Sequence, residues 1–365
     1  MRLGVRAALA GGALVAGDVE IEGERIARLG VRPAGAAGTA VPGFVDLQVN
    51  GFAGVDFLAA DAEGYRRAGE ALAAAGVTAF LPTLVSSPLD AYGEAIATVA
   101  GLEGRLRPRA LGVHLEGPFL SPRWAGAHDP AHLRGPDPRL ARRLCAAGPV
   151  RIMTLAPELP GALEVIEALT RAGVVVSCGH SDADGDAAHA AFDRGAAAIT
   201  HVHNAHRRWR PRDPGLGGVA LARPDVTVQA IVDHVHLAPE TAYATFLAAR
   251  GRFCLVTDAI AAAGLEPGDQ RLGTAAVRVA EGVARLPDGT LAGSLVTMDE
   301  AVRNLTAMGA SLADAVEAAA AVPARLVGRS DLGMLREGGR ADVAVLDEDL
   351  RVARTVVDGI EAFAR

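Results

Sequence analysis

Apolar runs alternate with segments of helical period through the middle of the chain. Eight runs rich in valine, leucine and isoleucine are separated mostly by alanine-rich segments. The runs span residues 41–49, 77–81, 110–115, 150–155, 174–178, 197–202, 226–232 and 253–257. The helical segments span residues 62–75, 88–101, 138–147, 161–172, 185–195 and 238–250. Eight largely apolar strands alternating with helices predict an α/β fold, a (β/α)8 TIM barrel whose strands are buried on both faces.

The two ends of the chain follow a different pattern, in which apolar and polar residues alternate. Residues 18–26 alternate about a glycine turn and predict a hairpin, and residues 338–346 and 354–359 predict further strands. The first 16 residues resemble a signal peptide in composition, but glycines interrupt them and they run straight into the hairpin, so we interpret them as structure. We expect residues 1–41 and 331–365 to form a small β-sandwich domain beside a barrel of residues 42–330.

An insert follows the eighth run. Residues 277–292 contain an Asp288-Gly289 turn between alternating segments and predict a hairpin. Thr297 followed by Glu300 is a capping-box pattern, which predicts the start of the next helix, so we give these two residues a structural role.

Composition and charge exclude several classes of protein. The chain has 365 residues, 50% hydrophobic and 22% charged, and no apolar run of 18 residues, so we expect neither disorder nor a membrane partner. The formal net charge of −7 disfavours a nucleic-acid partner. All 36 basic residues are arginine, which excludes Schiff-base chemistry, a P-loop lysine and a lysine-derived metal bridge. The three cysteines lack metal-binding spacing and predict reduced thiols in the cytoplasm.

Polar residues follow most of the predicted strands, at the end of the barrel where barrel enzymes build their active sites. They are Gln48 and Asn50 after the first run, His114 and Glu116 after the third, His180 after the fifth, His201, His203 and Asn204 after the sixth, Asp233, His234 and His236 after the seventh, and Asp258 after the eighth. One such histidine alone is more often a hydrogen-bonded structural residue, and one such aspartate is often a helix cap. The joint pattern instead favours a site, because a structural explanation needs a separate buried partner for each group.

One carboxylate and two imidazoles facing a common point make a three-ligand metal site with an open position. We expect Glu116, His180 and His201 to be these ligands. A metal there would lower the pKa of bound water to about 7 and polarise a carbonyl group. Asp258, on the last strand, would take a proton from the water and give it to a leaving amine.

At this point the residues resemble a known family, the N-acetylglucosamine-6-phosphate deacetylases of the amidohydrolase superfamily. The resemblance covers nearly the whole chain and rests on motifs that occur in one order. They are PGFVD at 42–46, HLEGPF at 114–119, GAH at 126–128, LAPE at 155–158, GHS at 179–181, TH at 200–201 with NA at 204–205, DPGL at 213–216, LVTDA at 255–259, and GS at 293–294 before TM at 297–298.

The resemblance implies the same ligands and the same acid/base, and it adds a substrate. Ala127 and His128 would line the sugar site, and His236 would bind substrate near the scissile amide. The residues implied to contact the sugar phosphate are Asn204, Ala205 and Arg212. In relatives of this kind the residues matching Arg212 and His236 reach across a dimer interface, so we expect a homodimer.

The implied reaction is hydrolysis of the acetamide of N-acetylglucosamine 6-phosphate to glucosamine 6-phosphate and acetate, in amino-sugar catabolism. We expect one divalent metal ion per subunit, Zn²⁺ first, with Fe²⁺, Mn²⁺ or Co²⁺ as alternatives, because a Glu-His-His set accepts each of them. Two alternatives stay open: a related amidohydrolase for N-acetylgalactosamine 6-phosphate or a cyclic amide, and a non-catalytic homologue that binds a sugar phosphate.

The chain departs from the family pattern in two places. Gln48-Val49-Asn50 stands where many amidohydrolases carry His-x-His, which predicts a single metal and leaves Gln48 and Asn50 as supporting or substrate-contacting residues. After His201, the chain has His203, His206 and the basic run 207–210. Strand residues two apart share a face, so His203 would also point at the site, unless it is a hydrogen-bonded loop histidine. These departures bear on which sugar is preferred.

Overall fold

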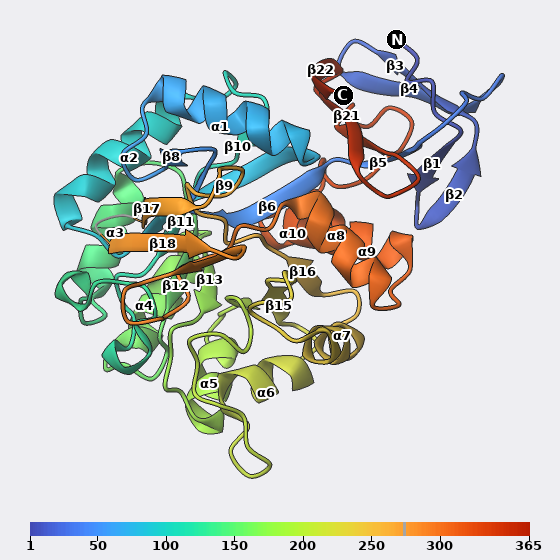
Figure 1. Cartoon of the computed structure of the whole chain (residues 1–365). Coiled ribbons are helices and arrows are strands. Elements are labelled where there is room, and N and C mark those ends of the chain that lie inside the picture. Colours follow the sequence, from blue (N-terminus) through green and yellow to red (C-terminus); the bar gives the residue numbers. More distant parts are fainter. Residues whose placement is uncertain (273–274) are drawn as a thin grey trace.

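The computed structural model describes residues 1–272 and 275–365, and its centre is a nearly closed barrel of eight parallel strands (Figure 1). The strands are β6 (Phe44–Val49), β9 (Val77–Val85), β11 (Val113–Glu116), β12 (Val150–Leu155), β13 (Val175–Cys178), β14 (Ala198–Ile199), β15 (Thr227–Ala230) and β16 (Phe253–Leu255). Short strand β10 (Arg109–Ala110) also pairs with β9. The first and last strands meet where the Asn50 N–H donates to the Ala259 carbonyl over 2.7 Å. The predicted barrel is confirmed.

Helices surround the barrel. They are α1 (Ala62–Ala74), α2 (Leu89–Gly101), α3 (Pro138–Ala146), α4 (Ala162–Arg171), α5 (Gly185–Asp193), α6 (Gly215–Ala222), α7 (Pro239–Ala248), α8 (Met298–Ala307), α9 (Leu312–Ala319) and α10 (Ala321–Leu326), with single 3₁₀ turns η1 (Pro122–Trp124) and η2 (Pro130–His132). The six predicted helices are confirmed to within a few residues at their ends. Helix α6 was not predicted, because Gly215, Gly217 and Gly218 are poor helix formers and blur its pattern.

Two predicted strands end differently in the structure. The run 41–49 divides into β5 (Thr39–Pro42), which joins the terminal sheet, and β6 of the barrel. The break is at Gly43, where a Cβ atom would lie 2.2 Å from Thr78. The run 197–202 is extended only as far as Ile199, because His201 (φ 29°) and His203 (φ 74°) adopt left-handed backbone conformations.

The chain termini build a separate pair of sheets beside the barrel (Figure 1). One sheet has the order β2 (Ala13–Ala16), β1 (Ala7–Ala10), β5, β20 (Val343–Leu346), β21 (Val352–Val357), β22 (Ile360–Ala364), and the other is the hairpin of β3 (Asp18–Glu22) and β4 (Arg25–Val31). Buried side chains of both sheets, including Val19, Ile26, Val343 and Val356, form a core of their own. The predicted sheets from both termini are confirmed, whereas the domain limits at residues 41 and 331 stay a prediction.

The insert contains a hairpin of β18 (Ala275–Ala280) and β19 (Val283–Arg285), extended by β17 (Gly268–Leu272). This hairpin turns at residues 281–282 rather than at the predicted Asp288-Gly289, where a turn instead leads from β19 to a single bridge between Arg285 and Leu291. The short strands β7 (Gly51–Phe52) and β8 (Val55–Asp56) pair nearby. Helix α8 begins after Thr297 as predicted, but the Thr297 hydroxyl donates to the Asp299 carboxylate rather than accepting from the main chain, so the capping box does not form. Among the described residues, no helix is long and apolar enough to cross a bilayer.

Candidate active site

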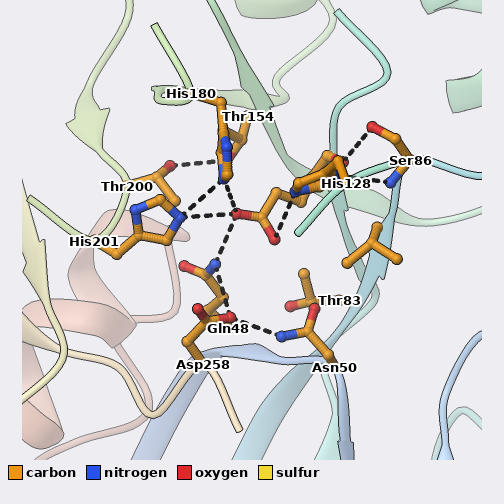
Figure 2. Close-up of polar contacts among 12 residues, drawn as sticks. Gln48, Asn50, Thr83, Ser86, His128, Thr154, His180, Thr200, His201 and Asp258 are labelled. Carbon is orange, nitrogen blue, oxygen red and sulfur yellow. Dashed lines mark hydrogen bonds and ion pairs between the residues drawn. The ribbon is translucent and has the colours of Figure 1, made fainter. Parts of the chain in front are cut away.

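Three side chains from separate strand ends converge at the mouth of the barrel. Glu116 is the last residue of β11, and His180 and His201 follow β13 and β14 by two residues. The Glu116 Oε1 atom lies 3.1 Å from His180 Nε2 and 3.0 Å from His201 Nε2, and the two Nε2 atoms lie 3.1 Å apart (Figure 2). All three side chains are buried. They offer one carboxylate oxygen and two imidazole nitrogens to one point.

The protonation of His180 makes this point suited to a cation. His180 Nδ1 lies 2.8 Å from the Trp124 carbonyl oxygen, which can only accept, so Nδ1 carries the proton. Nε2 is therefore the His180 nitrogen that points at Glu116 Oε1, and it is the nitrogen left to bind a cation held at this point. The cluster fits a divalent metal, with the second ring nitrogen of His180 fixed by the main chain.

Electrostatics keep Glu116 ionised. Burial alone would raise the pKa of this carboxyl, but the hydrogen bonds with His180 and His201 hold its pKa well below the usual value. Glu116 is therefore ready to bind a metal as a carboxylate.

Left-handed backbone conformations aim three of the site residues. His180 (φ 49°), His201 (φ 29°) and Asp258 (φ 50°) lie in the region that residues other than glycine seldom adopt. Each comes just after a barrel strand, where the turn directs its side chain over the barrel mouth. Such conformations cluster at functional sites, where the surrounding fold maintains them.

Two amides from the first strand hold Asp258 beside the three-residue cluster. The Asn50 side chain donates to Asp258 Oδ1 over 2.7 Å, and Gln48 Nε2 donates both to Asp258 Oδ1 (3.1 Å) and to Glu116 Oε1 (3.0 Å). Burial and the nearby charge of Glu116 raise the pKa of Asp258 to about 6. A carboxyl with such a pKa can both accept and return a proton near neutral pH.

The three cluster residues, Asn50 and Asp258 line one cavity of about 300 Å³. Its other lining residues include Ala127, His128, Asn204, Ala205 and His236, and the insert contributes Leu272, Thr290 and Leu291. Five of the six residues expected to contact substrate therefore lie at one cavity with the cluster. The sixth, Arg212, is exposed and does not line this cavity.

The two remaining cavity histidines are oriented by fixed partners. The Ser86 N–H donates to His128 Nδ1 over 3.1 Å, so His128 is neutral with its proton on Nε2, and burial lowers its pKa to about 3. His236 Nδ1 lies 2.7 Å from Asp233 Oδ2, and Asp233 Oδ1 accepts the His236 main-chain N–H over 2.8 Å. His236 therefore presents Nε2 as its free nitrogen.

The structure places His203 away from this cavity. Its Nε2 lies 3.0 Å from Thr245 Oγ1 of α7, and it lines a different cavity. Of the two interpretations of His203, the hydrogen-bonded loop histidine is confirmed, and it does not share a face with His201 because neither residue is in extended backbone. His206 is buried beside the His201 ring and donates from Nε2 to the Thr200 carbonyl over 2.9 Å.

A buried polar layer beneath the site was not predicted from the sequence. His114 Nδ1 lies 3.0 Å from the Leu47 carbonyl, so its Nε2 accepts from Thr154 Oγ1 (2.8 Å). Thr154 in turn accepts from Thr200 (2.8 Å), and Thr200 accepts from Ser177 (2.6 Å). These residues lie on β11, β12 and β13 and just after β14, so the layer ties together the strands that carry the cluster and the strand β12 between them. Its signal in the sequence was a polar residue inside each apolar run.

Comparison with known proteins agrees with this geometry. The profile of the Amidohydrolase family matches residues 39–361. The chain is 40% identical over 329 residues to the N-acetylglucosamine-6-phosphate deacetylase of Bos taurus, covering 86% of this chain and 80% of that protein. It is 35% identical over 317 residues to the N-acetylgalactosamine-6-phosphate deacetylase of Escherichia coli O157:H7, covering 85% and 84%.

A solved structure is similar over almost the whole length. It is a Mycobacterium smegmatis N-acetyl-D-glucosamine-6-phosphate deacetylase variant in complex with N-acetyl-D-glucosamine 6-phosphate, with a TM-score of 0.94 and 37% identity over 99% of this chain and 98% of that one.

Proposed function

The chain belongs to the N-acetylglucosamine-6-phosphate deacetylases of the amidohydrolase family, and from this premise we propose that it hydrolyses the acetamide of N-acetylglucosamine 6-phosphate to glucosamine 6-phosphate and acetate. The observation that carries the proposal is the meeting of Glu116, His180 and His201 with Asp258 in one cavity. A protein that only binds a sugar phosphate has no need of a carboxyl held beside such a cluster.

Glu116, His180 and His201 would hold the metal. When bound, a divalent ion supplies Lewis acidity, which activates water and polarises the amide carbonyl. We propose Zn²⁺ as the ion, with Fe²⁺, Mn²⁺ and Co²⁺ as alternatives, because imidazole and carboxylate ligands suit all four.

Asp258 transfers the protons in this mechanism. As a carboxylate it takes a proton from the attacking water, and as an acid it gives that proton to the amine that leaves. The amides of Gln48 and Asn50 keep its Oδ1 atom in place, which leaves Oδ2 for the proton. His236 Nε2 stabilises the negative charge that develops on the carbonyl oxygen.

The sugar occupies the rest of the cavity. His128 and Ala127 lie against the sugar ring, and Asn204 and Ala205, which line the same cavity, contact the phosphate. We propose that Arg212 completes the phosphate site of a partner subunit in a homodimer, because this arginine is exposed and does not line the cavity of its own chain. The free cysteines among the described residues favour a reducing cytoplasm.

Amine release from N-acetylglucosamine 6-phosphate by metal-loaded protein tests the proposal directly. Unphosphorylated N-acetylglucosamine is the control for the phosphate. We expect fast release with the phosphate ester and much slower release without it. No release from either sugar would reject the deacetylase function.

N-acetylgalactosamine 6-phosphate is the second candidate substrate. The deacetylase of Escherichia coli O157:H7 named for this sugar is 35% identical to the chain, not far below the 40% of the glucosamine relative. Because the two sugars differ only at one hydroxyl group, kcat/KM for both should be measured side by side. A higher value for the galactosamine ester would reassign the preferred substrate and leave the reaction unchanged.

A further inference from the structure

A second cavity adjoins the active-site cavity, beside the loop that follows His201. It has a volume of about 310 Å³ and is lined by Arg123, Trp124, Asp182, Arg207, Arg208, Arg210 and Asp213. We call it the arginine cavity. Arg123 and Trp124 line both cavities and form the wall between them, and no other lining residue is shared.

The arginine cavity has an excess of positive charge. Its lining carries four arginines against two aspartates, which leaves two positive charges in a chain whose net charge is −7. Arg123 pairs with Asp182 (2.6 Å) and Arg207 pairs with Asp213 (2.8 Å). Within residues 1–272 and 275–365, neither Arg208 nor Arg210 has a carboxylate within ion-pairing distance. Two guanidinium groups are therefore available to a ligand.

The walls of the cavity are held in place by contacts on both sides. Asp182 accepts from Trp124 Nε1 over 2.8 Å as well as from Arg123, so it fixes the shared wall. On the other side, the Arg207 N–H donates to the Ser181 carbonyl (2.9 Å), and Arg210 and Asp213 exchange main-chain hydrogen bonds of 2.8 and 3.0 Å. The arginines thus project from a loop that is anchored to the end of β13.

Trp209 anchors the middle of the same loop. Its ring packs on α6, where ring atoms lie within 3.5 Å of the position that a Cβ on Gly218 would take. Trp209 is still 56% exposed, so its fluorescence depends on the solvent outside the cavity. The neighbours of Trp209 in the sequence, Arg208 and Arg210, both line the arginine cavity, and Arg208 also lines the cavity beside His203.

We propose that the arginine cavity is a separate binding site for a dianionic oxyanion, of which inorganic phosphate is the simplest. Guanidinium groups suit phosphate because their planar donors form paired, charge-assisted hydrogen bonds with its oxygens. Two unpaired positive charges match the charge of the phosphate dianion. The site differs from the phosphate contact at Asn204 and Ala205, which line the active-site cavity alone.

Tryptophan fluorescence can test the site, because the chain has two tryptophans and Trp124 lines the cavity. In the Trp209→Phe variant, Trp124 is the remaining emitter. Inorganic phosphate is titrated at constant ionic strength near neutral pH, with glucose 6-phosphate in a second series. The first probe represents free phosphate and the second the phosphoryl group of a metabolite.

We expect saturable quenching by phosphate in Trp209→Phe, and a loss of affinity of at least tenfold when Arg208→Gln and Arg210→Gln are added. The matched control is Arg105→Gln with Arg142→Gln, which removes two exposed arginines elsewhere and should leave the affinity unchanged. Equal affinity with and without Arg208 and Arg210 would overturn the proposal, since the anion would then bind in the active-site cavity. Absence of saturable quenching by either probe, confirmed by calorimetry on the unmodified chain, would overturn it as well. Because binding is measured without turnover, these outcomes do not depend on the deacetylase function.

Discussion

The carboxylate of Asp233 lies 2.7 Å from Nδ1 of His236 and also accepts two main-chain N–H groups of its own turn, from Val235 and His236. The pair is buried at the edge of the cavity. Because Nδ1 donates to Asp233, Nε2 is the His236 nitrogen that faces the cavity, and it can donate to an oxyanion only when both ring nitrogens carry protons. Asp233 is thus a positioning residue for the proposed oxyanion contact.

Asp233→Asn should therefore lower kcat by about tenfold to a hundredfold, with a smaller change in KM. The amide has no negative charge with which to stabilise the imidazolium that contacts the oxyanion. Asp225→Asn, in an exposed ion pair, is the matched control. A change in KM alone, with kcat unaltered, would contradict this role.

Asp258→Asn should abolish turnover by orders of magnitude while the protein keeps its metal. The amide preserves the shape of the side chain, but it cannot carry the proton from water to the amine. Metal content by mass spectrometry and kcat are measured on the same sample. A variant with full metal and near-normal kcat would remove Asp258 from the mechanism.

Hybrid dimers can locate the phosphate contact of Arg212. Asp258→Asn and Arg212→Ala should each be nearly inactive alone at low substrate concentration. If Arg212 acts on the neighbouring site, mixing the two variants restores activity, because one site of the hybrid has Asp258 from its own chain and Arg212 from the other. No recovery on subunit exchange, checked by light scattering, would show that Arg212 does not act on the neighbouring site.

Asp46 should make folding stability depend on pH. This aspartate is completely buried between β6 and β16, where Thr257 Oγ1 donates to it over 2.5 Å, and burial raises its pKa to about 7. The native state therefore binds a proton that the unfolded chain has released between about pH 4 and 7, so stability falls as pH rises through this window and levels off above it.

Asp46→Asn should remove this pH dependence of folding stability, because the amide cannot ionise and can still form a hydrogen bond with Thr257. Between pH 5 and pH 7 the wild type should lose on the order of 2 kcal/mol more unfolding free energy than the variant. Denaturant titrations at the two pH values measure this difference. Parallel losses in both proteins would show that Asp46 ionises as freely when folded as when unfolded.

Arg109 should be a main contact between the barrel and the terminal sheets. Its guanidinium pairs with Asp342 (2.5 Å) and Asp358 (2.8 Å), and its side chain is only 12% exposed. Arg109→Gln removes the ion pair that each carboxylate forms with this arginine and should lower the unfolding free energy by about 3 kcal/mol. Arg66→Gln, on the exposed face of α1, should have little effect in the same thermal or denaturant assay. Equal effects of the two substitutions would show that the buried pairs add no stability.

Much of this molecule follows from its sequence alone. Period and alternation predicted the barrel and the terminal sheets, because a buried parallel strand must be apolar on both faces and a sandwich strand on one. The cluster of Glu116, His180 and His201 was predicted because the carboxyl ends of barrel strands all meet at one rim. The apolar pattern of each segment, and the rule that the carboxyl ends of barrel strands meet at one rim, were sufficient to predict these features.

Other features depend on contacts that only the folded chain makes. The sequence does not show that His203 turns toward Thr245, because left-handed backbone at the end of β14 breaks the strand alternation. The layer from His114 to Ser177 joins four strands and has no periodic signal. The arginine cavity likewise brings Arg123 beside Arg208, 85 positions apart in the sequence, because η1 and the loop after His201 meet at the same rim. Periodicity thus determines which face of an element is buried, whereas the meeting of distant loops depends on how the elements pack.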